Sequence, residues 1–141
     1  MGNRSGLKKQ GKAKNFRKVN NSPRVSYTLS KISEQSDGWC VEYSDKFGEW
    51  WDTLNEEEQI DVDAVVGLLE RLGPTLSFPY SSKINGSKYS RLRELRIQHA
   101  GRPYRILYAF DHRRTAILLV GGDKTGDDRW YTTNIPIAEA Q

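Results

Sequence analysis

Cysteine, histidine and long apolar runs are all scarce in this chain of 141 residues. The single cysteine, Cys40, excludes an internal disulfide and a cysteine-rich zinc site, and it suits a reducing cytoplasm. With only two histidines, a histidine-based metal centre is not expected, and we predict no cofactor. No apolar run reaches the roughly 18 residues of a membrane span, and no apolar stretch follows the basic N-terminus. We therefore predict a cytoplasmic protein without a membrane segment or a secretory signal.

Positive charge is concentrated at the start of the chain. Residues 1–38 hold nine Lys/Arg and two Asp/Glu, whereas residues 39–141 hold thirteen and sixteen. Residues 1–38 are also polar and lack sustained periodicity, which predicts a basic, disordered extension. This extension is either a nucleic-acid-binding arm or a passive segment, including one created by a start site placed too far upstream. Residues 39–141 are expected to form one domain.

A short strand and a helical hairpin are expected at the start of this domain. Large apolar side chains alternate over residues 39–43 (WCVEY), as in a strand. A stripe at helical spacing then predicts a first helix packed on the core. The stripe comprises Phe47, Trp50, Trp51 and Leu54. Asn55 and Glu58 match a capping box that begins a second helix, and Gly73-Pro74 ends it.

The second helix is expected to bury one apolar stripe and to expose acidic side chains. The stripe comprises Val65, Leu68, Leu69 and Leu72. Eight acidic residues and one lysine lie between Asp45 and Asp63, which we interpret as a solvated face.

Three antiparallel strands are expected after a loop at residues 75–91. They cover residues 92–98, 103–110 and 115–121, and the four-residue loops HAGR and DHRR connect them. A short helix is expected after Pro136. The predicted class is therefore α+β, with an N-terminal strand and a two-helix hairpin packed on a small antiparallel sheet.

The loop lengths fix a register in which Arg96 faces Arg105, Phe110 faces Thr115 and Arg105 faces Val120. Because side chains alternate along a strand, one face of the sheet collects an apolar set that receives the helical hairpin. That set comprises Leu95, Ile97, Tyr104, Ile106, Tyr108, Phe110, Ile117 and Leu119. The opposite face collects Glu94, Arg96, Gln98, Arg105, Leu107, Leu118 and Val120.

The facing arginines suggest an anion site. Like charges directly opposite each other cost about 0.2–1 kcal/mol, so stability gives no reason for this pair. Either Glu94 and solvent screen the two guanidinium groups, or the pair holds an anion such as phosphate. The following GGDKTGDD run fails the phosphate-loop pattern, because Asp123 replaces its second glycine, and its aspartates have the wrong spacing for a calcium loop. By strand alternation Lys124 joins the arginine face at its rim.

Basic residues and aromatic rings gather in the second half of the domain. Residues 83–114 hold nine Lys/Arg and two Asp/Glu. Such a surface suits RNA, which needs phosphate contacts and rings on which a base stacks. The candidate RNA-binding residues are Lys83, Lys88, Arg91, Arg93 and Arg102.

Three segments, RELRIQHAGRPYRILYAF, RRTAILLVGGDKTGDDRWY and IPIAEA, carry a family resemblance. Over about residues 39–140 the chain resembles the RelE/HigB-type toxins of bacterial toxin–antitoxin pairs. It is most similar to the phage-derived subgroup with the signature GGDKTGDDR(W/F)Y. The resemblance implies a small α+β RelE-like fold and metal-free cleavage of mRNA on the ribosome. It also implies a helix-turn-helix antitoxin as partner.

Carried over residue by residue, the resemblance places active-site cations at Arg96, Arg105 and Lys124. Metal-free RNA cleavage needs the 2′-OH deprotonated, the phosphorane charge stabilised and the 5′-oxygen protonated, and these cations suit the second task. The candidates for proton transfer are His99, Lys88 and Tyr89, which the sequence does not rank. His99 has a suitable ordinary pKa and is placed in the loop beside the arginine pair, where a plain loop residue is an equally good interpretation.

The chain departs from the family pattern at both ends. Residues 1–38 are additional, and the chain stops at Gln141, where relatives extend the C-terminal helix. The short end predicts poor cover for Leu107, Leu118 and Val120. Three functions stay open: an mRNA interferase, a ParE-like toxin that acts on DNA gyrase without cleaving RNA, and a truncated, inactive toxin that only binds its antitoxin.

Overall fold

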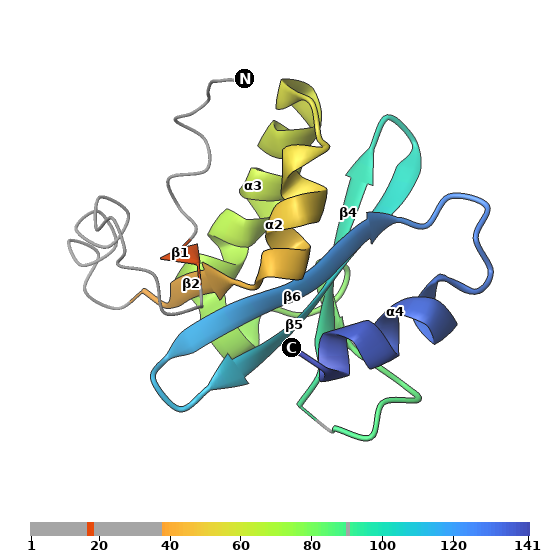
Figure 1. Ribbon diagram of the computed structural model, residues 1–141. Helices are drawn as coiled ribbons and strands as arrows, with labels where there is room; N and C mark the ends of the chain where they lie inside the picture. Colours follow the sequence, from red (N-terminus) through yellow and green to blue (C-terminus); the bar gives the residue numbers. More distant parts are fainter. Residues whose placement is uncertain (1–16, 19–37, 90) are drawn as a thin grey trace.

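The computed structural model describes residues 17–18, 38–89 and 91–141 (Figure 1). The expected extension over residues 1–38 therefore lies outside the described residues, apart from Gly38 and the two-residue strand β1 (Arg17–Lys18). β1 pairs in parallel with Glu42 and Tyr43, a contact that the sequence did not predict. Over the described ranges, no helix is both long and apolar enough to cross a membrane.

The domain is built on one mixed sheet of six strands, in the order β1-β2-β6-β5-β4-β3. The remaining strands are β2 (Cys40–Tyr43), β3 (Ser81–Lys83), β4 (Arg93–His99), β5 (Arg102–Asp111) and β6 (Thr115–Asp123). β2 runs parallel to β6, whereas β3, β4, β5 and β6 are antiparallel neighbours. The expected strands are thus confirmed, but the interval 75–91 is not entirely loop. Ser81 pairs with Leu95, and its buried hydroxyl shares a 2.7 Å hydrogen bond with Tyr108.

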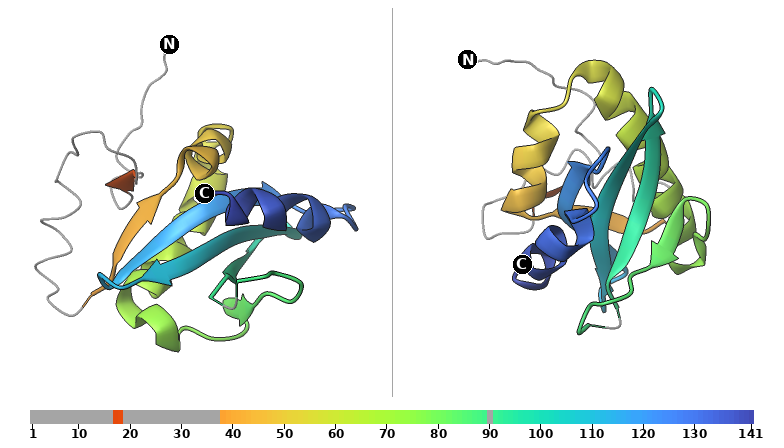
Figure 2. Two further views of the ribbon diagram at one scale, coloured as in Figure 1. Left: turned by 60° about the horizontal axis from the view of Figure 1, so that its bottom comes forward. Right: turned by 90° about the vertical axis from the view of Figure 1, so that its right-hand side faces the viewer.

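Helices cover both faces of the sheet. α2 (Asp45–Asp52) and α3 (Glu56–Leu72) form the expected hairpin on one face. α4 (Trp130–Glu139) packs on the other face. In Figure 1 it lies to the lower right of β6, whereas α2 and α3 lie to the upper left, and Figure 2 shows the same elements from two further sides. The capping box at the start of α3 is confirmed: the Asn55 side chain accepts from the Glu58 backbone N–H, and the Glu58 carboxylate accepts from that of Asn55, each at 2.8 Å.

The hairpin packs its apolar stripes on the sheet and forms the main core. Phe47 and Trp51 are buried, and Trp50 and Leu54 pack against them, which confirms the aromatic stripe as core. In α3 the buried positions are Val62, Val65, Val66 and Leu69, at helical spacing. Leu72 is exposed, so its predicted burial is wrong. The buried stripe starts at Val62 instead, and the short 3-10 turn η2 (Gly73–Thr75) redirects the chain directly after Leu72.

α4 forms a second core with the opposite face of the sheet. Trp130, Ile135 and Ala138 pack there with Leu92, Leu107, Leu119 and Val120. The helix begins six residues before Pro136, so the prediction of a helix after that proline is wrong. The predicted poor cover of Leu107 and Val120 is wrong for the same reason, because the longer helix buries both side chains.

The register between β4 and β5 is the predicted one, and Arg96 pairs with Arg105. The register between β5 and β6 is not: Arg105 pairs with Gly122, and Phe110 pairs with Ala116. β5 extends to Asp111, which shortens the connecting turn. A bulge at Leu107/Tyr108 then sets Val120 and Leu118 opposite consecutive residues.

The bulge reverses the predicted faces of β6. Leu118 is fully buried in the core under the helical hairpin, whereas Ile117 and Leu119 pack in the core under α4. Sequence alternation assigned these three residues the other way round, because it has no signal for an inserted residue.

Candidate functional site

The two arginines predicted to face each other do so on the α4 side of the sheet. They occupy directly paired positions of β4 and β5. The Arg105 side chain is only 6% exposed, whereas that of Arg96 is 30% exposed. Arg105 therefore forms the floor of the site, and Arg96 presents its guanidinium group toward solvent.

A buried carboxylate joins the two arginines. Glu94 lies two residues before Arg96 on the same face of β4 and is also 6% exposed. One of its oxygens accepts from Arg96 Nη1 at 3.1 Å and from the Ser82 hydroxyl at 2.7 Å. Its other oxygen lies 3.6 Å from Arg105 Nε. Glu94 thus compensates one of the two positive charges and orients the Arg96 guanidinium, whereas Arg105 Nη1 donates to the Tyr104 carbonyl at 3.0 Å. This is the screening that the sequence left open as one alternative.

Tyr131, in the first turn of α4, completes this cluster. Its hydroxyl donates to Glu94 Oε1 at 2.6 Å and accepts from Arg105 Nε at 3.3 Å. Burial, followed by the hydrogen bond to the Glu94 carboxylate, raises the pKa of Tyr131, so the phenol keeps its proton at neutral pH. Sequence reasoning missed this residue because it placed the helix after Pro136. The signal was available, since Tyr131 ends the GGDKTGDDRWY run.

Lys124 lies where strand alternation predicted it. β6 continues through both glycines to Asp123, and the Lys124 backbone N–H donates to the Pro103 carbonyl at 2.9 Å. The Lys124 ammonium group lies 5.8 Å from the centre of the Tyr131 ring. Arg96, Arg105 and Lys124 therefore surround one glutamate and one tyrosine, which leaves the cluster with a surplus of positive charge.

His99 lies on the opposite face of the sheet. β4 extends to this residue, so its side chain points toward α3, where Nδ1 is 2.6 Å from Asp61 Oδ2. The expectation of a loop histidine beside the arginine pair is wrong in position. Arg102 lies on the same side, with its guanidinium 3.0 Å from Asp123 and 3.4 Å from Glu58.

The other basic residues predicted to bind RNA lie away from the Arg96–Arg105 pair. Lys83, Lys88 and Arg91 are exposed in or beside the segment between β3 and β4. This segment is held by Glu139, which accepts from the Ser87 hydroxyl at 2.7 Å and from the Lys88 backbone N–H at 2.9 Å. Glu139 lies eight residues after Tyr131, about 12 Å along the helix. The structure therefore does not bring Lys88 to the arginine pair.

Tyr89 and Arg93 are also separate from the pair. Tyr89 is exposed in the same segment, with the Lys88 ammonium 5.9 Å from its ring centre. Arg93 donates to the Ser81 hydroxyl, which also bonds the core residue Tyr108. The roles of these residues in RNA binding stay predictions.

A pocket of about 470 Å³ opens beside the arginine pair. Arg96, Gln98 and Arg105 line it together with Pro79 and Tyr80, and it curves around the edge of β4 to α3. Among the described residues, β3 accompanies β4 only as far as Leu95, which leaves this edge open. The pocket therefore gives a ligand access to the exposed guanidinium of Arg96.

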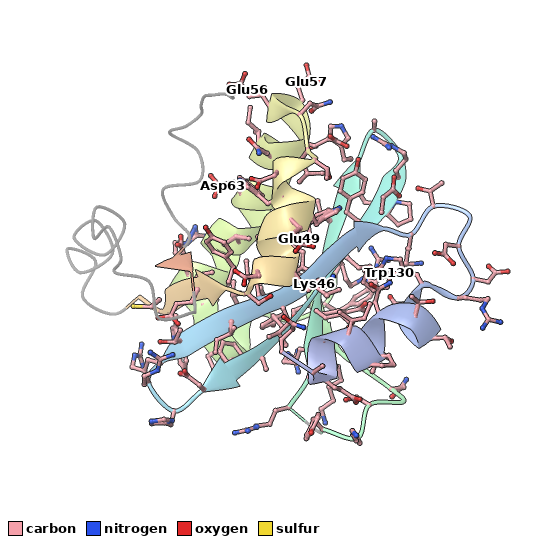
Figure 3. The ribbon with its side chains drawn as sticks, in the orientation of Figure 1. Lys46, Glu49, Glu56, Glu57, Asp63 and Trp130 are labelled. Carbon is pink, nitrogen blue, oxygen red and sulfur yellow. The ribbon has the colours of Figure 1, made fainter. Side chains whose placement is uncertain are left out.

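The charge of the α2–α3 side is opposite. Glu49, Glu56 and Glu57 are exposed and project from the two helices, whereas Trp130 points inward between α4 and the sheet (Figure 3). The solvated acidic face is thus confirmed for these side chains, but it is wrong for Glu58 and Asp61 of the same run, which turn toward the sheet and bind Tyr104 and His99. Within the part of the chain described, no group of three or more His, Cys, Asp or Glu side chains is arranged to hold a metal ion.

Comparisons with known proteins cover mainly the C-terminal two thirds of the chain. The sequence model of the family described as "Phage derived protein Gp49-like" matches residues 49–141. A Mycobacterium tuberculosis protein named "Putative toxin HigB3" is 48% identical over 91 residues, which cover 64% of this chain and 78% of that protein. A second, named "Putative toxin HigB2", is 36% identical over 115 residues, 79% of this chain and 57% of that protein. The chain thus spans little more than half of the second relative, and it belongs to the phage-derived Gp49-like family.

Proposed function

We propose that this chain is the toxin of a bacterial toxin–antitoxin pair and that it cleaves mRNA on the ribosome. Two relatives in Mycobacterium tuberculosis carry toxin names, which supports the first part. The observation that carries the second part is the surplus of positive charge in the cluster, where Arg96 contacts Glu94 and where Arg105 and Lys124 lie beside Tyr131. A phosphate in an RNA backbone is the anion that such a set of donors fits.

The two arginines divide the work of holding the phosphate. Arg96 is exposed enough to meet the substrate, and Arg105 supports it from the buried floor. Because Glu94 already holds Arg96, and the Tyr104 carbonyl and the Tyr131 hydroxyl already hold Arg105, little reorganisation is needed when charge develops on the phosphorane. Donors arranged in advance in this way contribute about 10²–10³-fold each to the rate.

Tyr131 is proposed as the proton donor. Cleavage by the 2′-OH forms a bond from O2′ to phosphorus and breaks the bond to O5′. The proton of O2′ passes to water, and O5′ takes a proton from Tyr131, whose phenolate recovers one from water. Burial and Glu94 raise the pKa of Tyr131, which opposes proton release, whereas the adjacent Arg105 acts in the other direction and favours it. The phenol of Tyr131 carries its proton at neutral pH, and its hydroxyl lies between Arg105 and Glu94. It is therefore placed to protonate the departing 5′-oxygen. His99, on the other face, and Lys88 and Tyr89, in the segment bound by Glu139, do not contact the described cluster.

The partner that we propose is a helix-turn-helix antitoxin, on the strength of the family resemblance. The alternative of a truncated toxin rested on the short C-terminus and on the poor cover expected for the sheet face. α4 covers that face with Trp130, Ile135 and Ala138, which weighs against this alternative. The second alternative is a toxin that acts on DNA gyrase. The cationic cluster is explained by phosphate binding and gives no separate reason to prefer that alternative.

Induced expression without the antitoxin tests the proposal. Wild-type protein should stop translation and produce new 5′ ends within translated messages. Arg96→Ala or Arg105→Ala should reduce cleavage by about 10²–10³-fold. Arg71 is an exposed arginine in the last turn of α3, and Arg71→Ala is the matched control that should cleave at the wild-type rate. Intact messages together with trapped gyrase–DNA breaks would contradict the proposal.

A further inference from the structure

Two exposed aromatic side chains lie next to the arginine pair. Phe78 is 70% exposed and Tyr80 is 45% exposed, and both lie in the short segment that precedes β3. Rings left in water contribute little to the stability of the fold. A single exposed ring needs no explanation, but two rings beside a cationic site are what a stacking surface requires.

Backbone hydrogen bonds hold this segment against β4. The Arg96 N–H donates to the Tyr80 carbonyl at 2.9 Å, and the N–H groups of Tyr80 and Ser81 donate to the Ser77 carbonyl at 3.0 and 3.1 Å. The Arg96 guanidinium carbon lies 5.1 Å from the centre of the Phe78 ring. The rings are therefore positioned by their backbone and by the arginine, while most of the Phe78 surface stays open to a ligand.

The neighbouring pocket has room for a nucleotide. Its volume of about 470 Å³ lies within the range of small-molecule sites, and Tyr80, Arg96, Arg105 and Gln98 share its lining with Asp61 of α3. Phe78 lies outside this lining and meets the pocket only through its contact with Arg96. Gln98 is exposed, and its amide offers both a donor and an acceptor to a base edge. One end of the site is thus cationic, and the other is aromatic with a polar amide beside it.

We infer that Phe78, Tyr80 and Gln98 form a base-binding subsite for an unpaired RNA nucleotide whose phosphate is held at Arg96. This inference rests on the proposed function and specifies how the substrate is held. The rings stack on the base, and Gln98 contacts its edge. Stacking tolerates every base but requires the nucleotide to be outside a duplex, so the subsite selects single-stranded RNA.

Substitutions at Phe78 separate stacking from simple packing. Phe78→Ala and Phe78→Leu should each lower kcat/KM for mRNA cleavage by about tenfold or more, whereas Phe78→Trp and Phe78→Tyr should keep most of it. Tyr80→Ala should act in the same direction. Ile60→Ala removes a side chain that is 48% exposed on α3 and should leave cleavage unchanged.

A second readout does not depend on cleavage. A short single-stranded RNA that contains 2-aminopurine should lose fluorescence when it stacks on the wild-type protein, and Phe78→Ala should abolish this change. If wild-type protein cleaves RNA and the Phe78 and Tyr80 variants cleave and quench equally well, the subsite is overturned and the proposed function stands. If the quench depends on Phe78 but no RNA is cut, the subsite stands and the proposed function fails. Loss of antitoxin binding alone in Phe78→Ala would overturn the inference in favour of a protein-binding surface.

Discussion

The β4–β5 hairpin carries a charged cluster on each of its two faces, built from the same residue types. On the α4 face, Tyr131 donates to Glu94, and Arg105 lies beside both. On the α3 face, Tyr104 donates to Glu58, and the Arg102 guanidinium lies 5.2 Å from the Tyr104 ring centre and 3.4 Å from Glu58. The two clusters differ in the balance of their charges.

Acids are the majority on the α3 face and the minority on the α4 face. The α3 cluster has three carboxylates for one arginine and one histidine: Glu58, Asp61, Asp123, Arg102 and His99. The α4 cluster has one carboxylate for three cations: Glu94, Arg96, Arg105 and Lys124. Arg102 and His99 each contact a carboxylate of α3, so that network ties the hairpin to α3. Only the α4 cluster has unbalanced positive charge to offer a ligand, which is why we place function there.

Removal of one hydroxyl from each face gives the largest expected contrast. Tyr131→Phe should lower the cleavage rate by about 10²-fold, because it removes the proposed proton donor, and should leave the substrate KM nearly unchanged. Tyr104→Phe should leave cleavage unchanged but lower the free energy of unfolding by about 1–3 kcal/mol, because Glu58 loses a buried donor. Cleavage rates and denaturant unfolding of both variants test this contrast. Equal cleavage by the two variants would remove the proposed role of Tyr131.

Substitutions of two glycines test whether the α4 cluster depends on how closely α4 packs on the sheet. A Cβ on Gly122 would lie 2.5 Å from Trp130 Nε1, so Gly122→Ala should displace the start of α4. We expect a loss of about 1–3 kcal/mol in stability and a parallel loss of cleavage. Gly67→Ala is the control, since its Cβ would meet nothing within 4 Å in the helix α3. It should stabilise the protein by about 0.5–1 kcal/mol and leave cleavage intact.

The smallest expected effect is the pH dependence of the α3 cluster. Burial alone would raise the pKa of Glu58, but hydrogen bonds from Tyr104 and the Asn55 backbone, with the charge of Arg102, hold it below its usual 4.5. This stabilisation is present above the usual pKa and is lost as pH falls through the lower folded value. Burial and the bond to Glu58 raise the pKa of Tyr104 to about 12, so its contribution is present below about pH 10 and is lost as pH rises from 10 to 12.

Denaturant unfolding across pH measures these two contributions. The wild-type protein should lose stability at both extremes, and Tyr104→Phe should flatten the alkaline loss and weaken the acid one. A variant curve parallel to that of the wild type would show that the phenol–carboxylate pair does not stabilise the fold.

The elements with strong local signals could be predicted from the sequence. The capping box fixed the start of α3, and the short HAGR turn fixed the register that sets Arg96 opposite Arg105. Lys124 followed from alternation alone, because β6 runs unbroken through Gly121 and Gly122. All three cations of the candidate cluster could therefore be predicted from local patterns.

The misplaced features depend on contacts between distant segments. Because of the bulge, Leu118 packs in one core and Leu119 in the other. A sequence of consecutive apolar residues contains no signal for the position of such a bulge. Local preference puts proline at the start of a helix, but packing of Trp130 on the sheet extends α4 six residues ahead of Pro136. Tyr131 enters the site only through that extension. β3 is three residues long and is held by β4, so it has no periodicity of its own to detect.

We propose that Arg105, on the α4 face, acts on RNA and that Arg102, on the α3 face, does not. Purified Arg105→Ala and Arg102→Ala, compared with wild type on ribosomes translating one defined mRNA, test it most directly, with thermal melting to confirm that each variant is folded. We predict that Arg105→Ala cleaves about 10²–10³-fold more slowly than wild type and that Arg102→Ala cleaves at the wild-type rate. Wild-type cleavage by a folded Arg105→Ala, or an equal loss in both variants, would contradict the account.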